Sequence, residues 1–171
     1  WYDVLKWCNA RSEKEGLIPV YQLSGEETYR TGESVPILNA RASGYRLPTE
    51  AEWEWAASGG AQTQGFLYSG SDDVGAVAWH SHNSPKGPQV VGLKSANELG
   101  IHDMSGNVWE WCWNETDGSG RQIRGGGYWN LAEENAIANR DESRTPDVRE
   151  GNLGFRLVTL GVQIIGEFQE I

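Results

Sequence analysis

The segment MSGNVWEWCWN, residues 104–114, places an acidic side chain among tryptophans. Its aromatic and branched residues predict a strand from Val108 to Trp113, along which successive side chains point to opposite faces. Three tryptophans then share one face, namely Trp109, Trp111 and Trp113. Glu110 lies on the other face with Cys112, so an ionisable carboxylate occupies a position flanked by groups that are usually buried. The charge of Glu110 therefore needs a partner.

The turn before this strand offers such a partner in the form of a bound cation. Calcium takes about six to eight oxygen ligands and mixes carboxylates with backbone carbonyls. The carboxylates of Asp103 and Glu110, with the carbonyls of Gly106 and Val108, form a candidate calcium site, although their spacing is not that of an EF-hand. The alternatives are that Glu110 points to solvent on an edge strand or pairs with an arginine such as Arg124.

Other residues give weaker chemical signals. His80 and His82 would share one strand face and could bind a transition metal with a carboxylate, but such pairs are more often surface or hydrogen-bonding features. Cys112 has no histidine near it in sequence and has bulky apolar neighbours, so we expect a buried, inert thiol. The run Gly125–Gly127 lacks the lysine and the strand–loop–helix context of a phosphate-binding loop, which favours tight packing or a bulge.

Two helices are expected to position these groups. Residues 1–16 repeat apolar side chains at the i, i+3, i+4 and i+7 spacing of an amphipathic helix, which a glycine ends. The second helix runs from about Glu50 to Ser58. Thr49 and Glu52 form a capping box at its start, because each side chain can satisfy a backbone N–H there.

Short strands and irregular segments make up the rest. Strands are expected at residues 18–23, 108–113, 121–129 and 154–160. Arg46 and Arg156 lie in otherwise apolar stretches, so each is expected to be buried beside a charge partner. Residues 129–153 show no sustained period, and a loop of that length in a compact domain is usually functional or disordered.

Length and composition limit the class of protein. The 171 residues suit one domain with a real core. A net charge of −10 argues against nucleic-acid binding. Two cysteines, Cys8 and Cys112, leave open one bridge or two free thiols. No stretch of about 18 apolar residues exists, so no spanning helix is expected. Because Trp1 already belongs to a helix, we expect the natural chain to begin upstream.

Four segments together resemble a known family. They are GYRLPTEAEWEWAA, GIHDMSGNVWEWCWN, RGGGYW and NLGFRLV. Their order and spacing are similar to those of the formylglycine-generating enzyme (sulfatase-modifying factor) superfamily, over nearly the whole chain. The resemblance implies an α+β fold of the C-type-lectin-like kind, with two helices, short twisted strands and much irregular structure. It implies a single domain over residues 1–171 whose N-terminal part is missing.

The resemblance also bears on metals. The family's calcium site matches Asp103, Gly106, Val108 and Glu110, which implies structural calcium there. A second family calcium site falls on AVAWHSHNSPKGPQ, which is shortened here and lacks the aspartate, so it is not expected. Enzymatic members hold copper with two thiolates in the segment after the glycine motif. Residues 125–156 contain no cysteine, so the copper chemistry is not expected either.

A non-enzymatic branch of the family fits better. Variable proteins of diversity-generating retroelements use this scaffold to display a hypervariable ligand-binding surface near the C-terminus, and residues 125–158 resemble that region. The expected ligand-contact residues are Tyr128, Trp129, Asn130, Leu131, Asn135, Asp141, Ser143, Asp147, Val148 and Asn152. The implied partner is a protein or other macromolecular ligand on a target surface. The implied location is the bacterial cell surface, with a lipid anchor in the upstream part.

Several alternatives stay open. Tyr128 and Trp129 either supply rigid contact area or pack in the core. Four glutamates in the region, Glu133, Glu134, Glu142 and Glu150, cannot arise from an Asn codon by changes at its adenines, so they are fixed or come from other codons. The other functions are an enzyme of the same superfamily, or a degenerate remnant of one, and a structural or regulatory domain of a larger protein.

Overall fold

The computed structural model describes residues 1–118, 120–140 and 143–159. In chain order the elements are α1 (Tyr2–Lys14), β1 (Tyr21–Gln22), β2 (Ile37–Leu38), α2 (Glu50–Ala57), the 3-10 turn η1 (Gly60–Gln62), α3 (Val74–Val77), β3 (Trp109–Glu115), β4 (Arg121–Arg124), the 3-10 turn η2 (Ala132–Asn135), β5 (Ser143–Arg144) and β6 (Leu153–Gly154). Two main helices, short strands and long irregular segments confirm the predicted α+β class. No helix in these ranges has the length and apolar character needed to cross a membrane.

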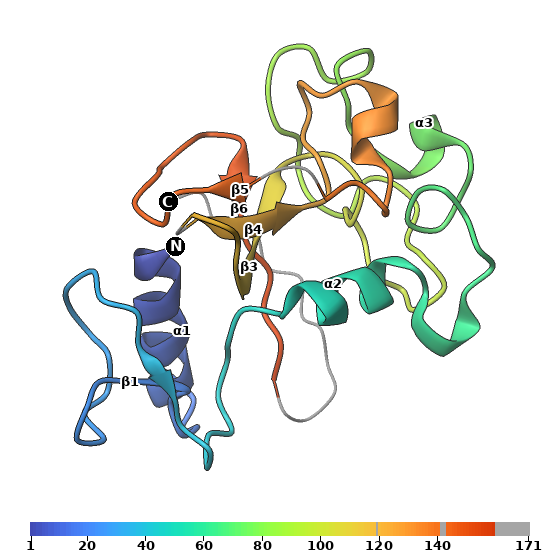
Figure 1. Cartoon of the computed structure of the whole chain (residues 1–171). Coiled ribbons are helices and arrows are strands. Elements are labelled where there is room, and N and C mark those ends of the chain that lie inside the picture. Colours follow the sequence, from blue (N-terminus) through green and yellow to red (C-terminus); the bar gives the residue numbers. More distant parts are fainter. Residues whose placement is uncertain (119, 141–142, 160–171) are drawn as a thin grey trace.

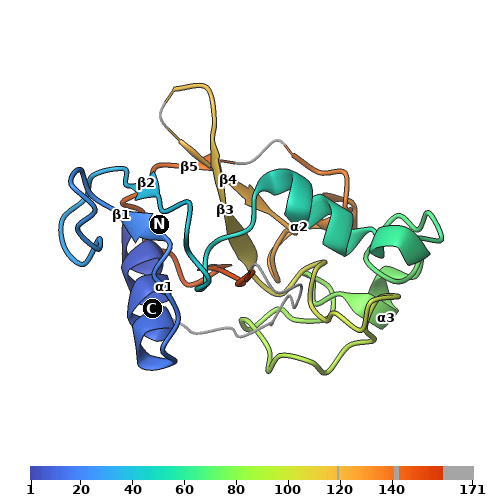
Figure 2. The same ribbon diagram turned by 90° about the horizontal axis from the view of Figure 1, so that it is seen from below.

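A four-stranded sheet lies at the centre of the molecule. Its strand order is β5-β4-β3-β6, with β3 antiparallel to β4 and parallel to β6. Helices α1 and α2 lie on opposite sides of β3 and β4, as Figures 1 and 2 both show. A separate two-stranded sheet, β1-β2, lies beside α1. The sheet is thus covered on both faces, which is why the first four residues of β3, Trp109 to Cys112, are all buried whichever face they point to.

The last predicted strand is much shorter than expected. Only Leu153 and Gly154 pair with β3, and Val158 then forms an isolated bridge with Arg46. Between these two contacts the chain leaves the sheet, and the side chain of Arg156 turns inward to a buried carboxylate. The apolar pattern of residues 154–160 therefore reflects burial without continuous strand pairing.

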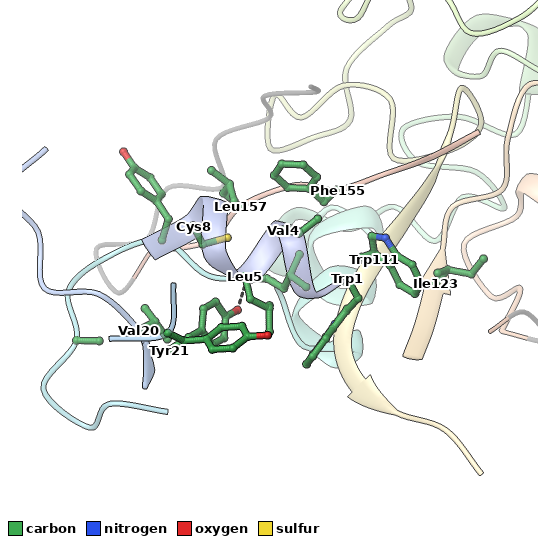
Figure 3. Packing of buried hydrophobic residues seen from close by; sticks show 14 of the residues in the cluster. Trp1, Val4, Leu5, Cys8, Val20, Tyr21, Trp111, Ile123, Phe155 and Leu157 are labelled. Carbon is green, nitrogen blue, oxygen red and sulfur yellow. Dashed lines mark hydrogen bonds between the residues drawn. The ribbon is translucent and has the colours of Figure 1, made fainter. Parts of the chain in front are cut away.

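Helix α1 packs its apolar stripe against the tryptophan face of β3 (Figure 3). Val4, Leu5 and Cys8 are buried, as the helical spacing predicts. The ring of Trp1 stacks on that of Trp113, with centroids 5.2 Å apart. Aromatic pairs in this geometry add stability beyond the area they bury. The contact fixes the start of α1 against the sheet.

Helix α2 begins with the predicted capping box. The Thr49 hydroxyl accepts a hydrogen bond from the backbone N–H of Glu52, and the Glu52 carboxylate accepts one from the backbone N–H of Thr49. The same carboxylate accepts two hydrogen bonds from the guanidinium of Arg46, at 2.6 and 2.7 Å. Arg46 thus has the charge partner that the sequence predicts, although its side chain is 20% exposed and not buried as expected. The start of α2 is fixed to the preceding segment.

Residues 59–107 are mostly irregular, in agreement with their turn-rich sequence. Gly106 has a φ of 75°, pairs with Trp79, and donates its backbone N–H to the carbonyl of Gly125, directly after β4, at 2.8 Å. A Cβ at Gly106 would lie 2.3 Å from the carbonyl oxygen of Trp79. Only glycine allows this approach, so the turn before β3 depends on it.

Candidate functional site

Glu110 is fully buried on the α2 face of β3. The guanidinium of Arg156 donates two hydrogen bonds to its carboxylate, from Nε to Oε2 at 2.6 Å and from Nη2 to Oε1 at 2.7 Å. The indole Nε1 of Trp53 donates a third to Oε2 at 2.7 Å. A buried carboxylate is tolerated when its charge is paired and hydrogen-bonded in this way. Glu110 does not point to solvent. The alternative that it pairs with an arginine is confirmed, but the arginine is Arg156 and not the suggested Arg124.

Arg124 serves a different pair of carboxylates. It lies opposite Glu110 in the β3–β4 register, but its side chain extends to α2. Its Nη1 donates to Glu50 and its Nη2 to Glu54, each at 2.8 Å. The guanidinium is fully buried, so these ion pairs fasten β4 to α2.

The predicted calcium ligands meet the requirements of a cation only in part. Oδ2 of Asp103 accepts a hydrogen bond from the backbone N–H of Gly92 at 2.7 Å, and Oδ1 is buried with no hydrogen-bond partner in the described part of the chain. That oxygen is available to a cation. Glu110 already balances a guanidinium charge, and its Oε1 accepts one hydrogen bond there. Since a carboxylate oxygen has two lone pairs, a second interaction at Oε1 is compatible with the first.

After β4 the chain is held in place by backbone hydrogen bonds and by the side chain of Asn130. The backbone N–H of Tyr128 donates to the carbonyl of Asn107 at 2.7 Å. Oδ1 of Asn130 accepts hydrogen bonds from the backbone N–H of Gly127 and from the indole of Trp109, both at 3.0 Å. Asn130 was predicted to contact a ligand, but its amide oxygen supports the loop. These bonds fasten residues 127–130 to β3 and the turn before it.

Two large apolar side chains project from this fastened backbone. Trp129 is 53% exposed and Leu131 is 54% exposed. Tyr128 is only half-buried, and its ring lies 5.6 Å from that of Trp129 at a tilt of 47°. The alternative that Trp129 packs in the core is therefore wrong. A large exposed aromatic on a rigid support provides contact area at a small entropic cost.

The predicted contact residues further along lie elsewhere on the molecule. Ser143 in β5 and Asp147 are exposed. Val148 is half-buried and lines a small cavity of about 30 Å³ beside α1. Arg149 pairs with Asp3 at 2.5 Å, which fastens this loop to α1. The predicted surface therefore has two separate parts, one before and one after β5.

Two of the predicted contact residues are buried and a third lies outside the described residues. Asn135 is fully buried, and its Oδ1 would lie 2.2 Å from a Cβ on Gly126, whose φ is 76°. This close approach agrees with the tight packing predicted for the glycine run. Asn152 is 1% exposed, and its backbone carbonyl accepts a hydrogen bond from Trp109. Neither asparagine presents its side chain to a ligand here. Asp141 is the residue outside the described ranges.

Helix α2 holds the middle of the same segment, which the sequence did not predict. The Glu50 carboxylate accepts two hydrogen bonds from Arg140, from Nε and Nη2, each at 3.0 Å. The carbonyl of Ile137 accepts one from Nη2 of Arg124 at 2.6 Å. The four-residue spacing of Glu50 and Glu54 on one face of α2 was the available signal.

A family model described as a sulfatase-modifying factor enzyme 1-like domain matches residues 1–160. The protein belongs to this family. Its fold is that of formylglycine-generating enzyme-like and C-type-lectin-like proteins, since it matches the solved structure of Treponema denticola variable protein 1. That match has a TM-score of 0.80 at 32% sequence identity and covers 92% of this chain and 68% of the other.

Sulfatase-modifying-factor-like relatives carry several different names. The chain is 42% identical to the chaperone protein LppX of Paenibacillus barcinonensis, in an alignment that covers 75% of this chain and 56% of that protein. It is 33% identical to the formylglycine-generating enzyme of Streptomyces coelicolor, over 68% of this chain and 47% of the enzyme. The chain thus spans about half the length of the curated relatives it matches. Family membership alone does not fix an activity, because enzymes and a chaperone share it.

The two cysteines do not fit the copper-thiolate site of enzymatic family members. Both are free and fully buried, and they lie in different hydrophobic clusters, Cys8 with α1 and Cys112 with α2. Burial raises the pKa of both thiols, and the negative charge of Glu110 adds to this effect at Cys112. Two thiols on opposite sides of a sheet cannot hold one ion together. They behave as inert core residues, as predicted for Cys112.

The histidine pair forms no recognisable metal site. His80 is buried and His82 is exposed, in a turn and not on one strand face, with ring centroids 5.7 Å apart. Burial lowers the pKa of His80. In the ranges that the structure covers, His, Cys, Asp and Glu side chains form no group of three that could hold a metal ion. Only His82 is a surface residue, so the alternative of a surface pair holds for one of the two histidines.

Proposed function

We propose that the protein is a binding protein without catalytic activity that contacts a protein or other macromolecule through exposed side chains of residues 125–158. The contrast within residues 127–131 carries this proposal. The backbone of Tyr128 is hydrogen-bonded to the turn before β3 and the side chain of Asn130 to Trp109 in β3, whereas Trp129 and Leu131 are more than half exposed. Exposed side chains on a rigid support are typical of binding loops.

The test compares two matched double variants on an array of random-sequence peptides. Trp129→Ser with Leu131→Ser removes the proposed contact side chains. Ile37→Ser with Leu38→Ser removes two apolar side chains of similar exposure, 57% and 50%, in β2. We expect a set of spots that the β2 variant retains and the loop variant loses. Identical arrays for the wild type and the loop variant would contradict the proposal.

We also propose that a diversity-generating retroelement varies this surface. The similarity to a variable protein supports the proposal, as does the exposure of Leu131, Ser143 and Asp147 among the predicted contact residues. The expected finding is a near-repeat of the DNA encoding residues 125–158, close to the gene and differing only at adenines. If the DNA near the gene contains no such repeat, the retroelement proposal is contradicted and only the proposed binding function is left.

Chaperone activity is a second candidate, favoured by the 42% identity to a protein named as a chaperone. The exposed apolar side chains would then contact non-native chains. The wild type would suppress aggregation of reduced, denatured lysozyme, and the Trp129→Ser, Leu131→Ser variant would do so less. Binding of folded ligands without any effect on aggregation would favour the first candidate.

Structural calcium remains a proposal that rests on the unpartnered Oδ1 of Asp103. With it, Glu110 and the carbonyls of Gly106 and Val108 would hold the ion. Excess calcium would then raise the melting temperature of the wild type, because a ligand that binds only the folded state stabilises it. The Asp103→Asn variant would show a smaller rise. An equal rise in both proteins would exclude Asp103 as a ligand.

We further propose display on a bacterial cell surface through a lipid anchor in a part of the protein outside this sequence. The family resemblance supports this location. Protease treatment of intact cells that express the full-length protein would remove the domain. Protection until the cells are lysed would contradict the proposal.

A further inference from the structure

Two distant segments that carry exposed apolar side chains are brought together by backbone contacts beside η2. Leu67 is 51% exposed, and its carbonyl accepts a hydrogen bond from the backbone N–H of Ile137, just after η2, at 3.0 Å. Trp129 and Leu131 lie just before η2, where Oε2 of Glu134 accepts a hydrogen bond from the backbone N–H of Leu131 at 2.7 Å. Figure 1 shows η2 in orange in the same part of the molecule as α3, which follows the Leu67 turn.

Acidic side chains lie beside these apolar groups. Glu133 and Glu134 belong to η2 and are exposed. Asp72 is also exposed, and its Oδ1 accepts a hydrogen bond from the backbone N–H of Leu67 at 2.8 Å. The pKa of Tyr68, which follows Leu67, is raised mainly by burial and also by the charge of Glu133. We call these six residues the η2 surface: Leu67, Asp72, Trp129, Leu131, Glu133 and Glu134.

The charges of this surface are not balanced within the described part of the chain. None of its three acidic groups forms an ion pair there, whereas the α2 acids Glu50 and Glu54 both pair with Arg124. An exposed apolar patch beside unbalanced charge of one sign complements a partner with apolar and oppositely charged groups.

We propose that the η2 surface docks a basic, apolar segment of a partner protein. An apolar side chain would cover Leu67, Trp129 and Leu131, and flanking lysines or arginines would lie against the acidic groups. This inference rests on the proposed binding function and deepens it. It names the chemistry of the partner, and it adds Leu67 and Asp72 from outside residues 125–158. Apolar burial supplies affinity and the charges supply selectivity and a faster encounter.

Three synthetic peptides of equal length test the inference. One carries Leu-Phe between lysine pairs, the second carries Leu-Phe between glutamate pairs, and the third carries Ser-Ser between lysine pairs. The readout is the indole N–H signal of Trp129 in a nuclear magnetic resonance titration, assigned with a Trp129→Phe variant. We expect a saturable shift with the first peptide only, weakening as salt is raised.

Two double variants separate a local charge effect from a general one. Glu133→Gln with Glu134→Gln is expected to weaken binding of the first peptide about 5- to 10-fold, since each lost surface pair contributes little. Glu26→Gln with Glu27→Gln makes the same charge change at exposed positions beside β1 and is expected to leave binding unchanged. Equal weakening in both variants would overturn the inference, because attraction would then depend only on net charge.

The remaining outcomes distinguish this inference from the proposed function. If the glutamate peptide shifts Trp129 as strongly as the lysine peptide, the basic partner is wrong and the binding surface stands. If no peptide shifts Trp129, the η2 surface does not dock such a segment. The proposed binding function is then still tested separately, by the peptide array with the Trp129→Ser, Leu131→Ser variant.

Discussion

The two faces of β3 are both buried but are stabilised in different ways. On the α1 face, tryptophan side chains pack against an apolar helix stripe (Figure 3). On the α2 face, Glu110 is buried with Arg156 and Trp53 between apolar neighbours. Apolar packing is spread over many weak contacts, whereas a buried charge depends on a few partners at short distance. The α2 face is therefore the more sensitive to a single change.

The α2 face also supports the exposed segment. The buried side chain of Arg124 joins β4 to α2 and also binds the backbone of Ile137. Glu50 in α2 binds Arg140 in the same segment. The charged face thus fixes the middle of residues 125–158, while the apolar face fixes α1. The α2 face therefore both stabilises the fold and holds the exposed segment in place.

The largest expected effect is the loss of the buried carboxylate. Glu110→Gln removes the carboxylate that pairs with the guanidinium of Arg156, which is 1% exposed. Breaking a buried pair from one side costs about 3 to 5 kcal/mol of the free energy of unfolding. Urea denaturation followed by tryptophan fluorescence measures this loss.

A double variant provides the control for that prediction. Glu110→Met with Arg156→Met removes both charges, and we expect it to be less destabilised than Glu110→Gln alone, because no uncompensated charge remains. A double variant as unstable as the sum of the two single variants would show that the charges act independently.

The next effect concerns the apolar face. Leu5→Ala removes a side chain with no exposed surface from the contact between α1 and β3. The expected loss is about 3 kcal/mol in the free energy of unfolding, from lost burial and the cavity left behind. Leu38→Ala, at a half-exposed position in β2, is the control and should cost much less. A smaller loss for Leu5→Ala than for Leu38→Ala would contradict the packing described for α1.

The sequence predicted those features that depend on local pattern. The capping box of α2, the apolar stripe of α1 and the alternation along β3 all follow from residues a few positions apart. The partner of Glu110 lies 46 positions away, and no spacing rule connects the two. The charge of Arg156 showed that it needed a partner, but only the fold identifies which one.

The same limit applies to the predicted binding surface. Loop composition alone did not separate Trp129, which projects outward, from Asn135 and Asn152, which are buried. Exposed and buried asparagines have the same sequence signal, because an amide suits either a ligand contact or an internal hydrogen bond. Leu67 was missed because it is distant in sequence from residues 125–158. Only its backbone contact with Ile137 brings it close to the predicted binding surface.

A smaller effect depends on pH. Hydrogen bonds from Arg46 are the main reason that the pKa of Glu52 falls from 4.5 to about 2. A carboxyl whose pKa is lower in the folded state stabilises the fold above its unfolded pKa, and this stabilisation is lost as pH falls towards the folded pKa. The wild type should therefore be more stable than Glu52→Gln above about pH 5, with a gap that closes between pH 4.5 and 2.

The Arg46→Met background tests the cause of this pH dependence. Without the guanidinium, Glu52→Gln should change stability little at any pH, because the largest cause of the pKa shift is absent. Chemical denaturation at several pH values measures the change in the free energy of unfolding caused by Glu52→Gln in each of the two backgrounds. A gap that persists unchanged in the Arg46→Met background would assign the effect to the Thr49 cap.

The smallest expected effect on stability is at Trp129, the position on which the proposed binding role depends most. Trp129→Ala removes a large side chain that is 53% exposed and whose backbone stays fastened through Asn130 and its neighbours. We expect the free energy of unfolding to change by no more than about 0.5 kcal/mol, as is usual for surface sites. Peptide binding should nevertheless fall, which separates recognition from folding. Urea denaturation and the peptide array on the same preparation measure the two effects. A loss of stability comparable to that of Leu5→Ala would mean that Trp129 belongs to the core, and residues 125–158 would then lose the side chain on which their proposed role depends most.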